Sequence, residues 1–173
     1  PVVEHASTGI KGRGTEEVKT NDVNPRVGVG EVGYTVEFGR PGVGVRFRDI
    51  QEMTRELAGL GVRFEPQNPV SHLMTDRETG HLRADILNEK ILSAIVEIKT
   101  RLDMVESVLT TIERVNRRID TVTSVGISTR CDANGEDRLL APVLEDLGVR
   151  YERAKTNLGL GRITNEPVRE KVL

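Results

Sequence analysis

Two stretches expected to form loops hold most of the side chains that could do chemistry. The first, residues 71–81, contains His72, Asp76 and His81 ahead of a long apolar pattern. Imidazole and carboxylate groups together suit metal binding or general acid–base catalysis. His72 and Asp76 are therefore candidate catalytic residues, and His81 is a candidate ligand-binding residue. The spacing of these residues matches no standard metal signature, so no metal site is predicted. The alternative to a catalytic or binding role is that these side chains form turn and capping hydrogen bonds.

The second stretch, residues 129–138, follows a predicted strand, where binding sites of α/β and α+β proteins often form. Cys131 is a candidate catalytic nucleophile, although a reactive thiol needs a base and the nearby sequence supplies no histidine. Arg130 and Arg138 are candidate ligands for a carboxylate or a phosphate. Equally, both arginines can pair with the aspartates of the same stretch. None of these residues identifies a cofactor.

Two further glycine-containing segments add three candidate anion-binding cations. Lys11 and Arg13 alternate with glycines, and Arg162 closes the loop-like segment at 157–162. Backbone N–H groups of a glycine-rich loop can surround a phosphate, with a cation beside it. No P-loop spacing is present. The alternative is that residues 1–33 are an extended N-terminal arm that docks on the body of the protein or on a partner.

A single α+β domain over residues 34–173 is expected to position these stretches. Alternation of apolar and polar residues predicts a β-hairpin with strands at 34–38 and 43–47. An amphipathic helix is expected at 49–60, ending at Gly61 and followed directly by a strand at 62–65. These elements predict an antiparallel or mixed sheet.

A short internal similarity suggests that the domain contains two related halves. Residues 57–65 and residues 144–152 share a pattern of two leucines, Gly-Val-Arg, an aromatic residue and glutamate. With a strand expected at 121–128 and a helix at 139–147, each half reads as strand, helix, strand. A duplicated β-α-β arrangement, ferredoxin-like in topology, would follow. The alternative is that the repeated pattern is only a common way to end a helix.

The longest element predicted is a central helix. No glycine or proline occurs from His81 to Val125, and apolar residues recur there at steps of three and four. This spacing predicts an amphipathic helix over residues 84–118, about 50 Å long, with a heptad-like seam. Such a seam favours coiled-coil association into a homodimer. The alternative is a turn near residues 100–103 that divides the segment into a helical hairpin.

Composition limits the classes of partner. The 173 residues carry a formal net charge of −2, and aromatic residues are 3% of the chain. Neither bulk charge nor stacking platforms therefore favour nucleic acid. No apolar run approaches the roughly 18 residues of a membrane span. The single cysteine cannot form an intrachain disulfide. We expect a soluble cytoplasmic protein, and the excess of arginine over lysine is typical of thermophile-like compositions.

The sequence does not identify a reaction. The leading hypothesis is a homo-oligomeric interaction or accessory protein that associates through helix 84–118, with a further protein partner allowed. The alternative is a small enzyme or ligand-binding protein for an anionic metabolite. Its site would combine the stretches at 71–81 and 129–138, and these would have to meet in one pocket.

Overall fold

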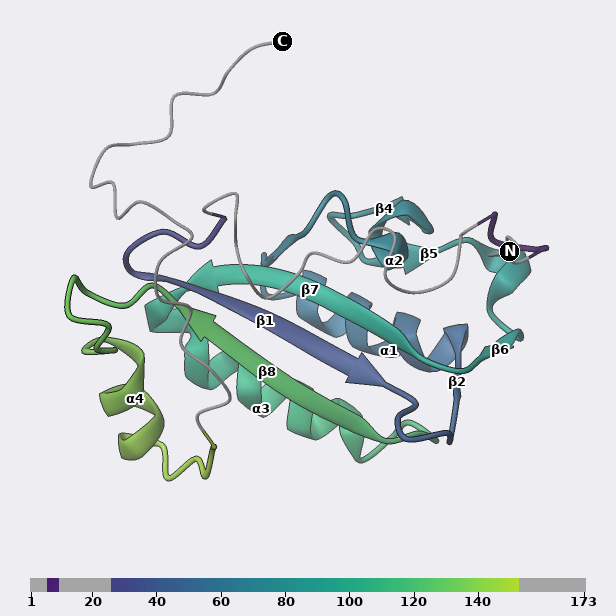
Figure 1. The fold of residues 1–173 in the computed structure, drawn as a ribbon. Helices are drawn as coiled ribbons and strands as arrows, with labels where there is room; N and C mark the ends of the chain where they lie inside the picture. The colour runs from purple at the N-terminus through teal and green to yellow at the C-terminus, as the bar shows by residue number, and fades with distance from the viewer. Residues whose placement is uncertain (1–5, 10–25, 153–173) are drawn as a thin grey trace, which may run out of the picture.

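The computed structural model describes residues 6–9 and 26–152 of the chain (Figure 1). Its strands are β1 Glu31–Phe38, β2 Val45–Arg46, β3 Arg63–Phe64, β4 Met74–Asp76, β5 His81–Leu82, β6 Lys90–Ile91, β7 Ala94–Arg101 and β8 Thr123–Thr129. Its helices are α1 Phe47–Ala58, α2 Pro69–His72, α3 Val105–Asn116 and α4 Leu140–Asp146, with short 3-10 helices η1 Ala84–Ile86 and η2 Leu102–Met104.

The main sheet has the strand order β3-β7-β1-β8, and every neighbouring pair is antiparallel. Its central strand, β1, places Tyr34 opposite Ile98 on β7 and opposite Ile127 on β8. The chain runs β1-α1-β3, then β7-α3-β8. This is the β-α-β-β-α-β connectivity called ferredoxin-like. The domain is therefore α+β with an antiparallel sheet, as the sequence predicts.

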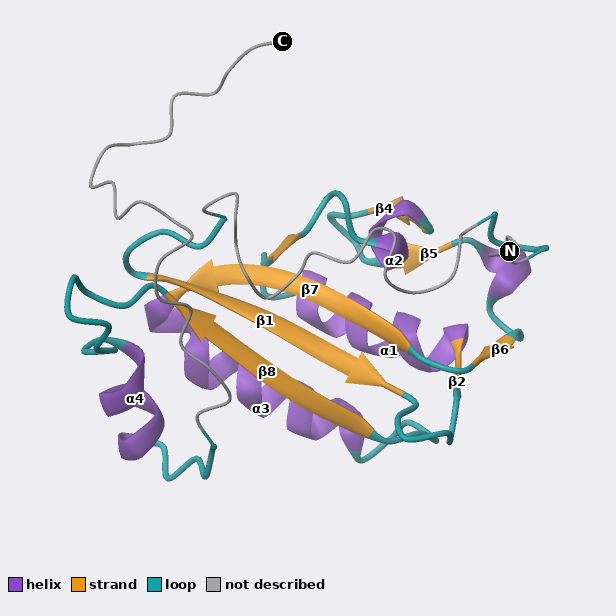
Figure 2. Cartoon of the chain, viewed as in Figure 1, coloured by secondary structure: helices purple, strands orange, loops and turns teal. Residues whose placement is uncertain are grey.

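One face of the sheet is covered by α1 and α3, which lie behind the strands in Figure 2. Alternate residues of β1 point into this layer and are fully or nearly fully buried: Val32, Tyr34, Val36 and Phe38. The helices supply the facing side chains at steps of three and four, including Ile50, Met53 and Leu57 of α1 and Val105, Val108, Ile112 and Val115 of α3. Every second side chain of β1 is therefore buried against the apolar sides of α1 and α3, and together these side chains form one core.

Residues 65–93 form a long insertion between β3 and β7. Within it, α2 lies against β7, and the β4–β5 hairpin packs on α1. The hydroxyl of Thr54 on α1 donates a 2.6 Å hydrogen bond to the carbonyl oxygen of Gly80 in the hairpin turn. Asn68 caps α2 by accepting from the Val70 N–H at 2.9 Å and donates to the Glu97 carboxylate at 3.0 Å. These buried polar contacts attach the insertion to the sheet and to α1.

The predicted helix over residues 84–118 is wrong. Only its C-terminal part is helical, as α3, whereas β6 and β7 occupy 90–91 and 94–101. In β7 the β-branched residues Val96 and Ile98 alternate with side chains on the opposite face of the sheet. Apolar residues spaced three and four apart were therefore not evidence of one helix, because the same stretch contains a strand, a short 3-10 helix and a separate α-helix. The seam of α3 is buried against the sheet, so a coiled coil on that seam is also wrong.

The predicted hairpin of strands 34–38 and 43–47 is wrong as well. The first strand pairs with β7 and β8, and the second shortens to β2, which pairs with β6. Phe47 already belongs to α1. Between the strands, the Gly44 N–H donates to the Gly39 carbonyl at 2.9 Å, and both glycines have positive φ angles. This glycine-rich turn directs the chain out of the main sheet.

The duplicated halves are not confirmed. The first predicted half agrees with β1-α1-β3, but the second unit of the sheet is β7-α3-β8 and not residues 121–152. Instead, α4 follows β8 as an addition, and residues 149–152 form no strand. The repeated sequence pattern marks the ends of α1 and α4, where Gly61 and Gly148 adopt positive φ. At the N-terminal side, β1 begins inside the predicted arm, at Glu31.

Candidate functional site

The stretch at 71–81 uses its polar side chains to build a turn. The carboxylate of Asp76 accepts the Glu78 N–H at 2.8 Å and the Thr79 hydroxyl at 2.9 Å. The backbone N–H of Glu78 is the main reason that the pKa of Asp76 lies below its ordinary value. His72 ends α2 and His81 begins β5, and both are exposed. The contacts of Asp76 are therefore those of a turn-forming residue, the alternative given above for this stretch.

The stretch at 129–138 is also bonded largely within itself. Asp132 accepts the N–H groups of Asn134 and Glu136 at 2.9 and 3.0 Å, and the Glu136 N–H is the main reason that the pKa of Asp132 is lowered. Arg138 pairs with Asp132 at 2.9 Å and with Glu136 at 2.7 Å.

The other two candidate residues of this stretch are Arg130 and Cys131. Arg130 donates to the Val27 carbonyl at 3.0 Å. Cys131 is a free, half-buried thiol.

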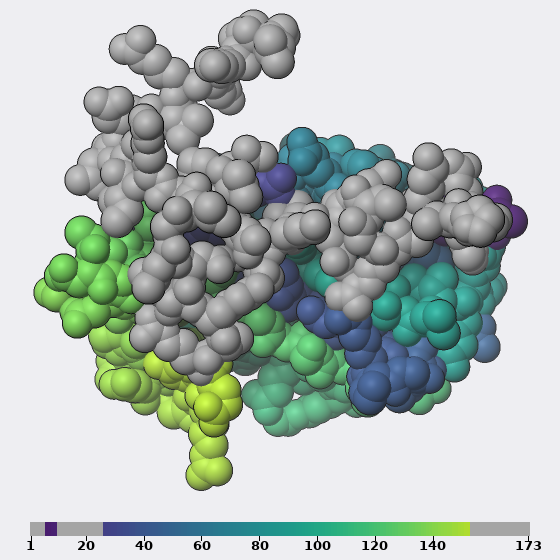
Figure 3. All heavy atoms as spheres, viewed as in Figure 1, coloured from purple at the N-terminus to yellow at the C-terminus, as the bar shows by residue number. Residues whose placement is uncertain are grey.

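The two stretches do not meet. Residues 130–138 follow β8 at one edge of the sheet, whereas the β4–β5 hairpin packs on α1 beyond the β7 side. Figure 3 shows the green surface of the former at the left end and the teal-blue surface of the latter at the upper right. The site that combines both stretches is therefore not assembled by these residues. Lys11, Arg13 and Arg162 lie outside the described residues.

His81 lines a groove of about 440 Å³ between α1 and the hairpin turn. The groove is charged, and its remaining lining residues are Glu52, Arg55, Glu56, Gly59, Glu78 and Thr79. The Glu56 carboxylate pairs with Arg114 of α3 and with Arg118, which follows the end of α3, each at 2.8 Å. The hydrogen bond from Arg118 is the main reason that the pKa of Glu56 is lowered. Much of this charge is therefore already neutralised by ion pairs that tie α1 to α3.

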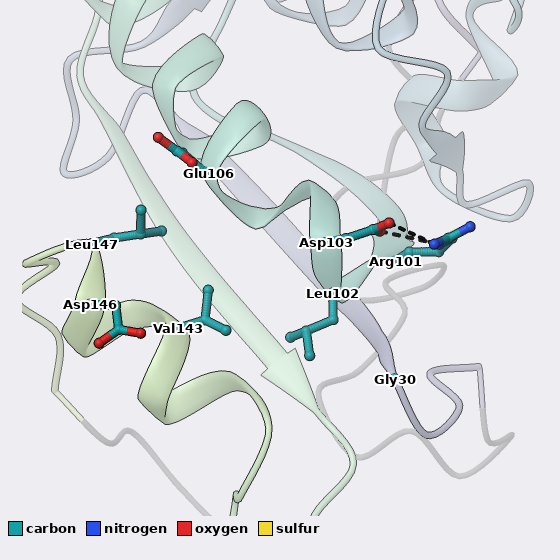
Figure 4. A pocket seen from close by; sticks show the side chains of 8 residues that line it. All are labelled: Gly30, Arg101, Leu102, Asp103, Glu106, Val143, Asp146 and Leu147. Carbon is teal, nitrogen blue, oxygen red and sulfur yellow. Dashed lines mark hydrogen bonds and ion pairs between the residues drawn. The ribbon is translucent and has the colours of Figure 1, made fainter.

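A second hollow, which we call the α3–α4 cleft, has the larger volume, about 480 Å³. It lies between the segment that leads into α3 and the exposed side of α4 (Figure 4). Its lining residues are Gly30, Arg101, Leu102, Asp103, Glu106, Val143, Asp146 and Leu147. Leu102 and Val143 point toward each other across it in Figure 4. Aliphatic side chains therefore form its floor.

Local structure explains why these aliphatic residues remain open. Leu140 and Leu144 of α4 are buried in the core, at 4% and 3% exposure. Val143 and Leu147 are also four residues apart, so they form a neighbouring row on the same helix and its C-terminal end. On the other wall, the Leu102 N–H donates to the Gly30 carbonyl at 3.0 Å, which fixes the turn into α3. The floor is thus built from elements that the core holds in place.

The charges around the cleft are mostly negative. Asp103 pairs with Arg101 through two hydrogen bonds, at 2.6 and 3.2 Å. Glu106 on α3 and Asp146 on α4 are exposed and form no ion pair with any described residue. An aliphatic floor flanked by two carboxylates that no described residue neutralises suits a ligand that is both apolar and cationic. It opposes binding of an anionic metabolite.

Sequence reasoning missed the α3–α4 cleft. None of its lining residues is among the predicted site residues, because neither histidine nor cysteine contributes to it. One signal was available: α4 carries a second apolar row, Val143 and Leu147, beside the buried row. Among residues 6–9 and 26–152, no group of three or more His, Cys, Asp or Glu side chains is arranged to hold a metal ion. In the same ranges, no helix is long and apolar enough to cross a membrane.

No protein-family model matches the chain, and searches of curated proteins and of solved structures found no significant match.

Proposed function

We propose that this chain is a non-catalytic interaction or accessory protein and that the α3–α4 cleft is its binding site for a partner protein. The partner would present a segment with aliphatic side chains beside lysine or arginine. The observation that supports this proposal is the aliphatic floor of Leu102, Val143 and Leu147 between the carboxylates of Glu106 and Asp146, which form no ion pair within residues 6–9 and 26–152. Burial of aliphatic side chains would supply affinity, and the carboxylates would supply orientation and selectivity.

The alternative of an enzyme for an anionic metabolite has less support from the geometry. His72 ends α2 beside the hairpin and Asp76 lies in the hairpin, whereas Cys131 follows β8 at the opposite edge of the sheet. Arg130 and Arg138 are engaged by groups of the protein itself. A nucleophile and its base act within hydrogen-bond reach of each other, and the three candidate catalytic residues are not so arranged. We therefore favour binding over catalysis.

Charge selectivity tests the cleft. We expect an amphipathic synthetic peptide of leucine and lysine, the lysine peptide, to bind the full chain. We expect its counterpart with glutamate in place of lysine to bind at least about tenfold more weakly. Glu106→Lys should weaken binding of the lysine peptide about tenfold, since attraction becomes repulsion. Fluorescence anisotropy with end-labelled peptides measures both dissociation constants.

The matched control is Glu113→Lys, the same charge reversal on the same helix but outside the cleft. Glu113 is exposed and, among the described residues, pairs with Arg117 one turn later, so its loss should cost little stability. Equal weakening by both variants would mean that only net charge matters. In that case, or if neither peptide binds, the cleft is not the site.

A further inference from the structure

Among the residues that the structure describes, the outer side of β8 is a sheet edge with no pairing strand. In the strand order β3-β7-β1-β8, β8 has β1 on one side only. Residues 123–129 make no backbone hydrogen bond to any described residue other than their partners on β1. Their side chains are half-buried or exposed, with Val125 at 37% exposure. A row of backbone donors and acceptors therefore faces outward along seven residues.

Hydrogen bonds at the two ends of β1 show which groups face outward. The Gly39 N–H donates to the Val122 carbonyl at 3.0 Å, which extends the register that pairs Phe38 with Thr123. At the other end, the Leu102 N–H donates to Gly30 on the β7 side. Bonded and non-bonded pairs alternate along antiparallel strands. The N–H and C=O groups that point away from β1 are therefore those of Thr123, Val125, Ile127 and Thr129.

This edge lacks the features that normally prevent pairing between sheets. Natural edge strands are protected by charged side chains, by proline, by bulges, by being short, or by a covering helix or loop. Residues 121–129, Thr-Val-Thr-Ser-Val-Gly-Ile-Ser-Thr, contain no charge and no proline, and β8 pairs with β1 without a register shift. The opposite edge differs, because β3 has two residues, one of which is Arg63. Protection by the strand's own residues is therefore present in β3 and absent from β8.

We propose that β8 pairs with β8 of a second copy of this chain, in antiparallel orientation, about a two-fold axis at Gly126. Thr123 then bonds to the partner's Thr129, and Val125 bonds to the partner's Ile127, so all outward groups of both strands are used. The exposed Val125 side chain gains an apolar neighbour. An uncharged strand pairs with itself without repulsion, which is why a second copy suits this edge.

The position of Gly126 fits this register. It lies opposite its own copy in a non-hydrogen-bonded pair, where Cα atoms approach to about 4.5 Å, and it brings no side chain to that point. Ser124 lies opposite the partner's Ser128 in the same kind of pair. Both serines are exposed on the sheet face away from the helices. The proposal relocates self-association from the predicted long helix to the sheet edge, and it is independent of the α3–α4 cleft.

Cysteine cross-linking tests both the pairing and its register. In a Cys131→Ser background, the double variant Ser124→Cys/Ser128→Cys should form a disulfide-linked dimer under mild oxidation, because paired Cα atoms lie within disulfide reach. Each single variant should stay uncrosslinked, since position 124 and its own copy are four residues apart along the strands, about 13 Å. Non-reducing electrophoresis of the full chain reads out the result. Efficient linking by a single variant, or none by the double variant, would overturn the proposal.

Native mass spectrometry over a concentration series gives the second measurement. The wild-type chain should show twice its 19.2 kDa mass, and Val125→Lys should shift the population to single chains. Thr110→Lys, an exposed position on α3 away from the edge, is the matched control and should remain dimeric. A wild-type chain that is monomeric at every concentration overturns the proposal, as does a Val125→Lys variant that dimerises as well as wild type.

Discussion

Replacing Gly80 by alanine is expected to destabilise the protein by about 2 to 4 kcal/mol, which would lower the melting temperature by roughly 10 °C. Gly80 has a φ of +71°, where an L-residue is strained by about 1–2 kcal/mol. A Cβ atom there would lie 2.3 Å from the carbonyl oxygen of Thr54. That oxygen belongs to the backbone of α1, so the hairpin and the helix would have to move apart.

The matched control for this prediction is Gly61→Ala. Gly61 has the same φ of +71°, but no atom lies within 4 Å of the Cβ position. It should therefore lose only the conformational part, about 1 kcal/mol. Thermal and urea unfolding of both variants measure the difference. If Gly80→Ala is no more destabilising than Gly61→Ala, the close packing of the hairpin on α1 is not a feature of the protein in solution.

Asn68→Ala is expected to cost about 2 to 4 kcal/mol of unfolding free energy, because one amide has two buried roles. Asn68 is 2% exposed, and its carbonyl oxygen caps α2 while its NH₂ group donates to Glu97. Glu97 is itself only 8% exposed. Loss of a cap typically costs about 1 kcal/mol, and loss of a hydrogen bond to a charged group about 1.5–3 kcal/mol.

Asn68→Ser separates these two roles. A serine keeps a capping oxygen for α2 but cannot donate to Glu97 from the same place, so it should recover about 1 kcal/mol of the loss. Asn134→Ala, at an exposed loop position, is the surface control and should change stability by less than about 0.5 kcal/mol. Urea unfolding distinguishes the three variants. Equal losses for the serine and alanine variants would show that the cap contributes nothing.

The elements that the sequence predicts correctly are those with local signals. The alternation of Tyr34, Val36 and Phe38 identifies β1, and the spacing of Ile50, Met53 and Leu57 identifies α1. The strand β8 and the helix α4 are also confirmed within a few residues of their predicted bounds. In each case the residues of one segment contain the full pattern, so neighbours in space are not needed to recognise it.

The elements that could not be predicted depend on contacts between distant segments. Residues 94–101 form a strand because β1 and β3 lie on either side of them, and this pairing overrides a spacing that also suits a helix. Asn68 and Glu97 contact each other across 29 positions in the chain. Nothing in the sequence around either residue indicates that contact. The false long helix and the missed insertion have this common cause.

The candidate site was missed for a related reason. Sequence reasoning favoured residue types that do chemistry. However, the carboxylates of Asp76 and Asp132 accept hydrogen bonds from backbone N–H groups two to four residues away. Such local bonds are the usual behaviour of aspartate in turns. The α3–α4 cleft instead combines Gly30, Leu102 and Val143 from three separate parts of the chain. Ordinary aliphatic residues reveal a binding surface only after the fold places them together.

Hydrogen exchange of the full chain, measured by mass spectrometry with and without the lysine peptide, tests the central claim most directly. The proposal predicts slower exchange in residues 101–109 and 140–149, the two walls of the α3–α4 cleft, and unchanged exchange in the β4–β5 hairpin. The glutamate peptide should leave both walls unchanged. Protection that is spread over the whole surface, or confined to the charged groove beside His81, would contradict the proposed interaction site.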